Sequence, residues 1–459
     1  MLALVSDLHF SDGSTAHNVD PGAFDLLGAD IEGALKHKKP NDVQIVLLGD
    51  IIDLVRTDYW ERNEIAPGER PWGGGLDPGT AININAAAVE KQFGDILNAI
   101  LAGASFQGLA TMLKGLGEKV GKPVRVTYVI GNHDRMLHNF PVLKNKIATA
   151  LNPVSVTFET RLPSTSVTDW PYGVLARHGH EFDEACHGWE FYRRVLNPGS
   201  PVGRFNPAVY RVQALGEVIT AELMSGFIAR LGKVVSPAVL DEYKDVNNLR
   251  PMTAVFSWIA WLLRQPSSTA APSVVIAALR TSLGAVLGCS LAKRWDDLKP
   301  DLIVSGDLTD YLSKLHYLLT KRGGIDLLER VLPIVDELQA KLNISLDSTD
   351  STLFKAAERE ATEGEAAPAD IQFILYGHSH DARYDCFRGR VDGRVKMYVN
   401  TGTFLSFIDR TLDGRGFFTS HRLSYVLVYA PEEDPDQRRD HWPTMDVWNG
   451  LRFKRYTYA

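Results

Sequence analysis

The chain has 459 residues, of which 45% are hydrophobic and 23% charged, a composition typical of a soluble globular protein. Its length exceeds that of a usual single core, so we expect one large domain with an insertion, or two domains. The net charge of −7 indicates no basic surface for nucleic-acid backbones. We therefore expect no nucleic-acid partner, and we infer no obligate protein partner.

The cysteines are Cys186, Cys289 and Cys386, and their odd number and wide spacing do not form a disulfide framework. This pattern fits a reducing compartment best. The first residues lack the basic segment and cleavage site of a signal peptide. No uninterrupted apolar run reaches the roughly 20 residues that a membrane-spanning helix needs. We therefore expect a cytoplasmic protein.

The first third of the chain indicates alternating strands and helices. Short apolar runs predict strands at Leu2–Ser6, Val43–Leu48 and Val124–Ile130. Helical spacing lies between them, at Gly22–Lys38 and Ile84–Ala102. This alternation indicates βαβ units with largely parallel strands, an α/β fold in which the loops at the carboxyl ends of the strands carry the ligands.

A long loop at Asp58–Pro78 contains Trp60 and Trp72. A long ordered loop beside a site is often a binding loop. An exposed surface loop without a binding role is an equally good interpretation of this segment.

The spacing of apolar residues changes after a strand predicted at Gly173–Arg177. From about residue 184 to residue 365 the apolar spacing is mostly helical. The acidic, alanine-rich residues 358–369 are typical of a linker. The helices predicted in this region include Val209–Ala229, Ala254–Leu263, Val274–Ala292 and Ile325–Leu342.

Strand patterns resume in the last part of the chain. The predicted strands are Ile371–Tyr376, Val395–Val399 and Ser424–Tyr429. We therefore predict a discontinuous core, with residues 1–183 as its first part and residues 371–459 as its second. Residues 184–370 would form a large, mostly α-helical cap insertion between them.

Five short motifs carry the chemistry, and each follows a predicted strand. Each motif is weak alone, but together they supply seven hard or borderline ligand groups, enough for two divalent ions. That is the composition of a binuclear hydrolase. The motifs are Asp7-Leu8-His9, Gly49-Asp50-Ile51-Ile52-Asp53, Gly131-Asn132-His133-Asp134, His178-Gly179-His180 and Gly377-His378-Ser379-His380.

Hydrolysis of a phosphate ester needs a nucleophile at neutral pH, neutralisation of oxygen charge and a proton for the leaving oxygen. Two cations about 3.5–4 Å apart can meet the first two needs, because a water bridging them loses its proton readily. Carboxylate and imidazole ligands suit Mn, Fe, Zn, Co or Ni, and we favour Mn²⁺. A histidine that is not a ligand can act as the general acid, with a carboxylate to orient it.

In this order the motifs resemble those of the calcineurin-like metallophosphoesterases, D-x-H, G-D-x-x-D, G-N-H-D/E, H and G-H-x-H, and all five blocks are intact. The resemblance covers the discontinuous core but not the insertion. It implies a four-layer αββα sandwich within the α/β class, with the metal ions at the strand ends. It also implies a binuclear metal-dependent phosphoric ester hydrolase that uses a metal-bridging hydroxide.

The same resemblance assigns roles to residues. His133 would be the general acid, Asp53 would orient it, and Asp134 would support the ligands from behind. Asp50 would bind both ions. One ion would be held by Asp7, His9, Asp50 and His380, and the other by Asp50, Asn132, His178 and His378.

Two departures argue against a protein phosphatase. Such enzymes typically have an arginine after G-D-x-x-D and end the third motif in glutamate, whereas this chain has Leu54 and Asp134. The motifs look more like those of bacterial small-molecule phosphodiesterases, including hydrolases that cleave UDP-diacylglucosamine. We therefore expect a small-molecule phosphodiester or pyrophosphate as substrate. A phosphomonoesterase is the near alternative, and a nuclease or a non-catalytic scaffold is favoured less.

Two residues are candidates for substrate binding. Arg135 directly follows the third motif and has a guanidinium suited to phosphate, and His180 lies in the fourth motif. In the insertion, Trp258 and Trp261 could line an acyl pocket or lie on a membrane surface. The ordinary interpretation of these two tryptophans is that they belong to the core of the insertion.

Overall fold

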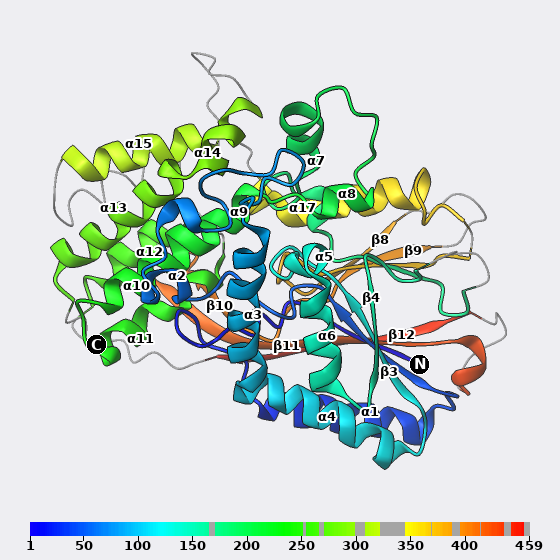
Figure 1. Cartoon of the computed structure of the whole chain (residues 1–459). Helices are drawn as coiled ribbons and strands as arrows, with labels where there is room; N and C mark the ends of the chain where they lie inside the picture. The colour runs from blue at the N-terminus through cyan, green and yellow to red at the C-terminus, as the bar shows by residue number, and fades with distance from the viewer. Residues whose placement is uncertain are drawn as a thin grey trace.

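The computed structural model is of mixed α/β class, with two β-sheets and helices packed against them (Figure 1). The α/β class expected from the sequence is thereby confirmed. The residues that the structure describes are 1–164, 170–250, 254–265, 270–298, 308–321, 345–368, 370–387, 395–413, 415–435 and 442–453.

The larger sheet has eight strands in the order β4-β3-β2-β1-β11-β10-β6, with β12 paired to β11. Strands β1 to β4 are parallel to one another, and the C-terminal strands join β1 through an antiparallel pairing with β11. Its strands are β1 (Leu2–Val5), β2 (Val43–Leu48), β3 (Val124–Val129), β4 (Ser155–Glu159), β6 (Leu249–Arg250), β10 (Ser406–Arg410), β11 (Phe417–Tyr429) and β12 (Thr444–Phe453).

The smaller sheet has four strands in the order β5-β7-β9-β8. Strands β5 and β7 are parallel neighbours although the whole of residues 184–370 separates them in sequence. Its strands are β5 (Val174–Ala176), β7 (Phe373–Tyr376), β8 (Arg383–Phe387) and β9 (Lys396–Asn400). The strands predicted in both parts of the chain are confirmed to within a few residues, except that β11 begins earlier than expected.

Buried side chains join the two sheets to each other and to helices. Alternate residues of β1 point to opposite faces, so Leu2 and Leu4 contact one cluster while Ala3 and Val5 contact another. The first cluster contains residues of both sheets, including Val46, Val129, Val174, Leu375 and Val399. The second cluster contains helices α1 (Gly22–His37), α3 (Ala86–Ala102), α4 (Ala104–Val120) and α6 (Pro141–Leu151).

Helix α17 (Ser345–Thr362) covers the smaller sheet on its other side. Ala356 and Ala357 of this helix are buried with Ile374 and Tyr398 of the sheet. In Figure 1, α17 lies above β8 and β9, whereas α1 and α4 lie at the bottom of the molecule. The linker prediction for residues 358–369 is wrong for its first five residues, because small alanines let the helix pack closely and it continues to Thr362.

The described part of residues 184–344 is mainly helical. The helix predicted at Val209–Ala229 is present as consecutive shorter segments, with a π-helical stretch at η4. The helix predicted at Ile325–Leu342 lies outside the described residues. The segments are α7 (Trp189–Phe191), η3 (Tyr192–Leu196), α8 (Pro207–Tyr210), α9 (Leu215–Val218), η4 (Ile219–Ser225), α10 (Gly226–Gly232), α11 (Pro237–Tyr243), η5 (Lys244–Asn248), α12 (Val255–Leu262), α13 (Pro272–Gly288), α14 (Ser290–Trp295), η7 (Asp296–Leu298) and α15 (Leu308–Lys321).

This helical region shares hydrophobic core with the larger sheet. Phe227 and Trp258 belong to the same buried cluster as Ile45 of β2. Strand β6 also comes from this region and pairs in parallel with β10. The helical region therefore packs into the larger sheet. Whether residues 184–370 form a separate cap domain stays a prediction.

One described helical segment, Pro207–Gly232, is long and apolar enough to cross a membrane. This segment qualifies by length and composition only, and it is not an uninterrupted apolar run, because Glu217 and Glu222 lie within it; the cytoplasmic location stays a prediction. Counting the bent pairs Ala86–Ala102 with Ala104–Val120, and Pro272–Gly288 with Ser290–Leu298, as one span each raises the candidates to three. In the structure 83% of the Pro207–Gly232 window is buried inside the protein.

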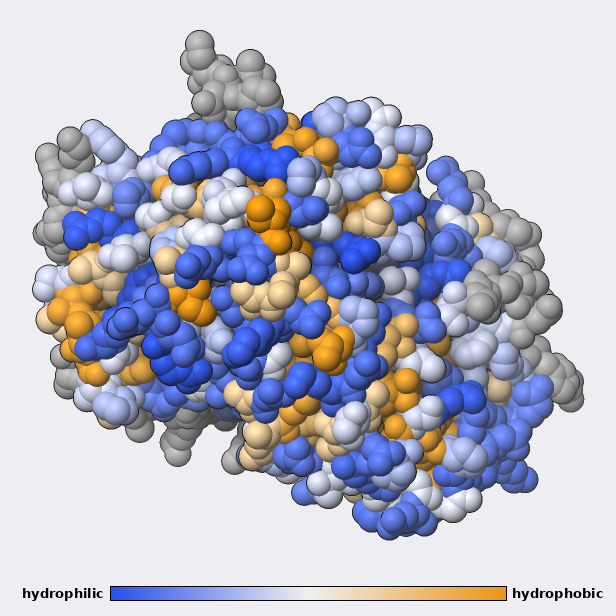
Figure 2. All heavy atoms as spheres, in the orientation of Figure 1, coloured by the Kyte–Doolittle hydropathy of each residue, from blue (hydrophilic) through white to orange (hydrophobic). Residues whose placement is uncertain are grey.

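Trp258 is buried in the protein, and Trp261 is half-buried against the larger sheet. Trp258 is 3% exposed, and the ring of Trp261 lies 5.7 Å from that of Phe417 on β11. Figure 2 shows, on the face that it draws, hydrophobic residues in small groups among hydrophilic ones. These contacts favour the core interpretation of the two tryptophans, and a lipid or membrane contact stays a prediction.

The loop at Asp58–Pro78 is tied down by buried charges. Trp60 and Trp72 are buried, and the Trp72 indole N–H donates to Glu222 Oε1 at 3.1 Å. Arg70 pairs with the same carboxylate, which also accepts from Arg230 at 2.8 Å. Trp72 and Arg70 therefore join the loop to the helical region. Short segments in and after the loop are α2 (Tyr59–Arg62), η1 (Pro67–Glu69), α5 (Met136–Asn139) and η2 (His180–Phe182).

Burial in the cluster between the sheets predicts that alanine substitutions at two leucines change the free energy of unfolding by different amounts. Leu2 is fully buried there, whereas the side chain of Leu412 is fully exposed. We expect Leu2→Ala to lower the free energy of unfolding by about 2–5 kcal/mol, because it leaves a cavity. Leu412→Ala should change it by less than about 0.5 kcal/mol. Urea unfolding of both variants measures this, and equal losses would contradict the described packing.

Candidate metal centre

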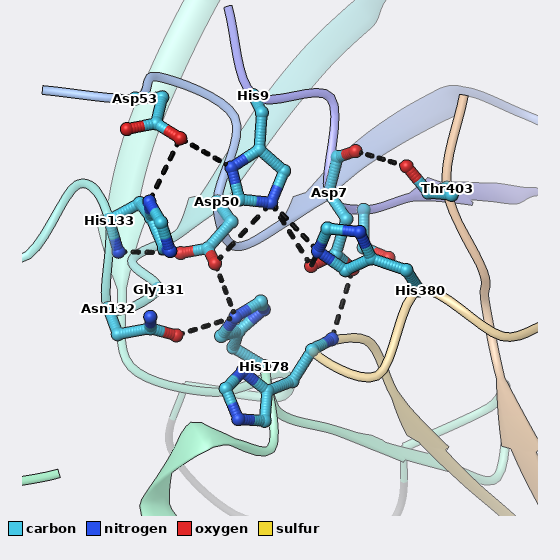
Figure 3. Close-up of polar contacts among 12 residues, drawn as sticks. Asp7, His9, Asp50, Asp53, Gly131, Asn132, His133, His178, His380 and Thr403 are labelled. Carbon is cyan, nitrogen blue, oxygen red and sulfur yellow. Dashed lines mark hydrogen bonds and ion pairs between the residues drawn. The ribbon is translucent and has the colours of Figure 1, made fainter. Parts of the chain in front are cut away.

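The loops after β1, β2, β3, β5 and β7 meet at one place, and the residues of all five motifs lie there (Figure 3). Adjacent parallel strands end at the same edge of a sheet, which brings motifs distant in sequence together. Backbone N–H groups link the loops directly. The N–H of His378 donates to Asp7 Oδ2 at 3.0 Å, and the N–H of His133 donates to Asp50 Oδ1 at 2.8 Å.

The backbone of these loops is strained at the candidate ligands. Among the described non-glycine residues, only Glu64 and Ala81 also have a positive φ. The left-handed conformation costs about 1–2 kcal/mol for a residue with a side chain, and such strain gathers at functional sites. The strained candidates are Asp7 (φ 52°), His9 (44°), Asp50 (52°), His378 (71°) and His380 (64°).

Asp7, His9 and His380 form the first group that could hold a metal ion. His9 Nε2 lies 2.9 Å from His380 Nε2, which lies 3.4 Å from Asp7 Oδ1. Asp7 Oδ1 is buried and accepts no hydrogen bond from any described residue. A buried carboxylate oxygen without a donor is costly unless a cation satisfies it. These residues therefore fit a metal ion.

Asp50, His178 and His378 form the second group. His178 Nε2 lies 3.2 Å from Asp50 Oδ2 and 3.2 Å from Asn132 Oδ1. Burial opposes protonation of His178, but the charge of Asp50 outweighs it and raises the pKa of the ring to about 10. The surroundings of Nε2 therefore attract positive charge, which a proton or a metal ion can supply.

Asp50 lies between the two groups. Its Oδ2 is 3.7 Å from His9 Nε2 of the first group, besides its contact with His178 of the second. His133 also lies close to His9 and Asp50. A further group, Asp183 with Cys186 and His378, lies behind the second. In the described part of the chain, every histidine and aspartate predicted as a ligand belongs to one of these groups. Asn132 lies beside the second group, next to His178.

Hydrogen bonds set which nitrogen each histidine turns toward the centre. His178 Nδ1 donates to the Leu48 carbonyl oxygen at 3.0 Å, so Nε2 is the nitrogen that faces Asp50 and the centre. His9 Nδ1 lies 2.7 Å from Asp53 Oδ2, so Nε2 of that ring is likewise turned toward the group. Burial, and then Arg250, hold the pKa of His380 well below its usual range, which keeps this ring neutral.

Asp53 also approaches His133, as Figure 3 shows. Its Oδ2 lies 2.9 Å from His133 Nδ1 and 2.9 Å from Arg56 Nε. Burial alone would raise the pKa of Asp53, but His133 and Arg56 outweigh it and lower that pKa. Burial likewise opposes a charge on His133, but Asp53 and then Asp50 raise its pKa. His133 is therefore a candidate proton donor.

Asp134 ties the second and third motifs together. Its Oδ1 accepts from the Gly131 N–H at 2.5 Å, and its Oδ2 accepts from the Ile51 N–H at 3.1 Å and the Tyr128 hydroxyl at 2.6 Å. Burial and the charge of Asp50 raise the pKa of Asp134. The side chain supports the loops that carry Asp50 and Asn132, as the sequence predicts.

The prediction that Arg135 binds substrate is wrong. Its guanidinium is buried and meets both carboxylate oxygens of Glu217, with Oε2 at 2.9 Å. It also donates to the Arg211 carbonyl at 2.9 Å. Its donors are therefore used within the protein. His180 is 1% exposed and packs 5.3 Å from the His178 ring, and a substrate-binding role for it stays a prediction.

Three residues that the sequence interpretation missed contact the centre. Asp183 Oδ2 lies 3.2 Å from His378 Nε2, and its place five residues after His178 was a usable signal. Arg56 follows Asp53 by three residues and contacts it. Arg250 Nη2 lies 2.7 Å from His380 Nδ1. No local pattern marks Arg250, because it ends a strand of two residues in the helical region.

No family model matches this chain, and no curated protein sequence matches it.

The close approach of Gly131 to Asp50 predicts the effect of a single methyl group. A Cβ at Gly131 would lie 2.2 Å from Asp50 Oδ1, whereas a Cβ at Gly115 in α4 would meet nothing within 4 Å. We expect Gly131→Ala to displace Asp50 and weaken metal affinity by about 10- to 100-fold. Gly115→Ala should retain the metal affinity of the wild type. Manganese titration of both variants tests this, and equal affinities would contradict the described site.

Proposed function

We propose that the protein is a metal-dependent phosphoesterase that hydrolyses a phosphodiester or pyrophosphate bond of a small molecule. One observation carries the proposal: two His/Asp groups converge on Asp50, with His133 held beside them by Asp53. Carboxylate, imidazole and amide oxygen together suit first-row divalent ions such as Mn²⁺.

We also propose that the chain is a calcineurin-like metallophosphoesterase with a four-layer αββα arrangement. The buried clusters support this order of layers. One cluster joins the two sheets, a second joins the larger sheet to α1, α3, α4 and α6, and a third joins the smaller sheet to α17. All five sequence motifs of that family are at the strand ends where the proposal requires them.

The proposed ligand sets follow from the two groups. Two divalent ions bound there would supply a nucleophile at neutral pH and neutralise charge on the phosphoryl oxygens. Asp50 would be shared between the ions. One ion would be held by Asp7, His9, Asp50 and His380, and the other by Asp50, Asn132, His178 and His378.

Contacts within the protein orient these proposed ligands without a metal ion. Asp53 holds the His9 ring, and the Leu48 carbonyl holds the His178 ring. Thr403 donates to the Asp7 carbonyl at 2.6 Å and fixes the first loop. Rings held in one orientation lose little freedom on binding, so the site is organised for cations in advance.

His133 would protonate the leaving oxygen. Its side chain is 14% exposed, more than that of Asp53 or His9, so it faces outward from the cluster. Asp53 stabilises the imidazolium form that carries the proton. The proton would leave the ring nitrogen opposite Asp53 and pass to the departing alkoxide as the phosphorus–oxygen bond breaks.

The first test measures metal content together with turnover of two nitrophenyl esters. We expect about two ions per chain after manganese loading, and faster hydrolysis of bis-p-nitrophenyl phosphate than of p-nitrophenyl phosphate. Asp50→Ala should lower metal content and abolish activity, because Asp50 is shared. Asp241→Ala removes a side chain that is 62% exposed and should change neither. Monoester preference would identify a phosphatase, and absence of both metal and turnover would refute the proposal.

His133→Ala should separate catalysis from metal binding. We expect this variant to keep its metal ions but to turn over a diester with a poor leaving group about 10²–10⁴-fold more slowly. With a nitrophenyl ester the loss should shrink, because a good leaving group needs little protonation. His37→Ala, an exposed position on α1, is the matched control. Metal loss in His133→Ala would show that His133 is a ligand instead.

The pH profile follows from the same residue. The pKa of His133 is raised above 6.5, and the protonated ring is the active form. Activity that depends on this proton is therefore present below that pKa and lost as the pH rises through it. We expect an alkaline limb in kcat/KM for the wild type that is absent from His133→Ala. An unchanged limb in the variant would assign it to another group.

A further inference from the structure

Arg250 brings a cation from the helical region to the proposed active site. It ends β6, where Leu249 and Arg250 pair in parallel with Ile408 and Asp409 of β10. The preceding turn η5 helps to place it, because Asn248 donates to Ser406 Oγ at 2.8 Å. The pairing places the Arg250 guanidinium beside the first His/Asp group.

The contacts of this guanidinium are with neutral groups. Nη1 donates to the carbonyl oxygens of Asn247 at 3.1 Å and Leu249 at 2.7 Å. Nη2 donates to His380 Nδ1 at 2.7 Å. Among the described residues, no carboxylate forms an ion pair with Arg250. Its positive charge is therefore solvated by carbonyls and one imidazole.

The neighbouring arginines differ in this respect. Arg56 pairs with Asp53 at 2.9 Å, and Arg422 pairs with Asp381 and lies 3.7 Å from Asp409. Arg250 is half-buried, and a partly desolvated cation whose contacts are all neutral groups is unfavourable unless an anion approaches it. The surroundings of Arg250 are therefore suited to an anion.

Geometry narrows the class of anion. A guanidinium presents planar N–H pairs that match two oxygens of a phosphate or carboxylate. Here it lies next to His380, one of the residues proposed to hold a metal ion. A phosphoryl group whose oxygens approach the metal positions would therefore come within reach of this arginine.

We propose that Arg250 binds a non-bridging oxygen of the substrate's phosphoryl group, so that a strand of the helical region completes the active site. This inference rests on the proposed function, because it takes the anion to be the phosphate ester that the site hydrolyses. The same contact would hold the phosphate product. Inorganic phosphate is therefore a suitable probe.

A purely structural role for Arg250 makes a different prediction. If the arginine only orients His380, its removal should lower metal content and leave phosphate affinity unchanged at full metal loading. If it binds the phosphoryl group, its removal should weaken phosphate binding and leave metal content unchanged. Metal analysis and phosphate titration of the same samples distinguish the two.

The experiment is calorimetric titration of inorganic phosphate into the manganese-loaded full chain. We expect Arg250→Gln to weaken phosphate binding by about 10- to 100-fold, the usual effect of losing a hydrogen bond to a charged group. The phosphate affinity of Arg250→Lys should lie between those of the wild type and Arg250→Gln, because lysine keeps the positive charge but not the planar guanidinium. Arg383→Gln is the control, since Arg383 is 43% exposed, follows the last motif closely and should not affect phosphate binding.

Each result has a defined meaning. Weaker phosphate binding with unchanged metal content supports the inference. Wild-type affinity in Arg250→Gln, metal loss in that variant, or failure of the loaded wild type to bind phosphate overturns it. If Arg250→Gln does not fold, Arg250→Lys carries the test. Phosphate binding through Arg250 without hydrolysis of any ester would refute the proposed function, and would show Arg250 to be an anion-binding residue of a site that is not an esterase.

Discussion

The rest of the site depends on the contacts of the buried Asp53 carboxylate. A single oxygen, Oδ2, lies within 3 Å of nitrogens of His9, His133 and Arg56. It therefore orients a proposed metal ligand and the proposed proton donor together. His133 and then Arg56 outweigh the burial that would otherwise raise the pKa of this carboxyl group. Arg56 Nη1 also lies 3.4 Å from Asn248 Oδ1 and connects this interaction to the helical region.

The second constraint is that the loops hold one another in strained conformations. Asp7, Asp50 and His378 have left-handed backbones, yet each is fixed by groups from another loop. Asp50 packs against Gly131, where a side chain would not fit, and accepts a hydrogen bond from the His133 N–H. No single motif would keep this geometry in isolation. The buried cluster between the sheets supplies the rigidity that holds the strand ends in place.

The sequence predicts well what is local and poorly what depends on distant contacts. The strand at Val43–Leu48 is found as predicted, because a compact apolar run ends at a glycine. Helix α4 was missed, because Gly108, Gly115 and Gly117 weaken its helical signal. The error at Arg135 has a similar origin, since its partner Glu217 is 82 residues away. The candidate ligands could be predicted to lie together because each motif directly follows a strand, whereas Arg250 reaches them only through pairing of β6 with β10.

The two groups differ in the charge behind their ligands. Asp183 stands behind His378, and a carboxylate partner makes an imidazole a stronger ligand. Arg250 stands behind His380, and a guanidinium partner makes that imidazole a weaker one. Within the first group, His9 has the Asp53 carboxylate behind it, whereas His380 has a guanidinium, so the two imidazoles of that group differ in strength as ligands. The guanidinium beside His380 is suited to anions, and it lies on the side where the helical region enters the site. In the proposed mechanism, this difference would give a bound phosphoryl group a preferred orientation across Asp50.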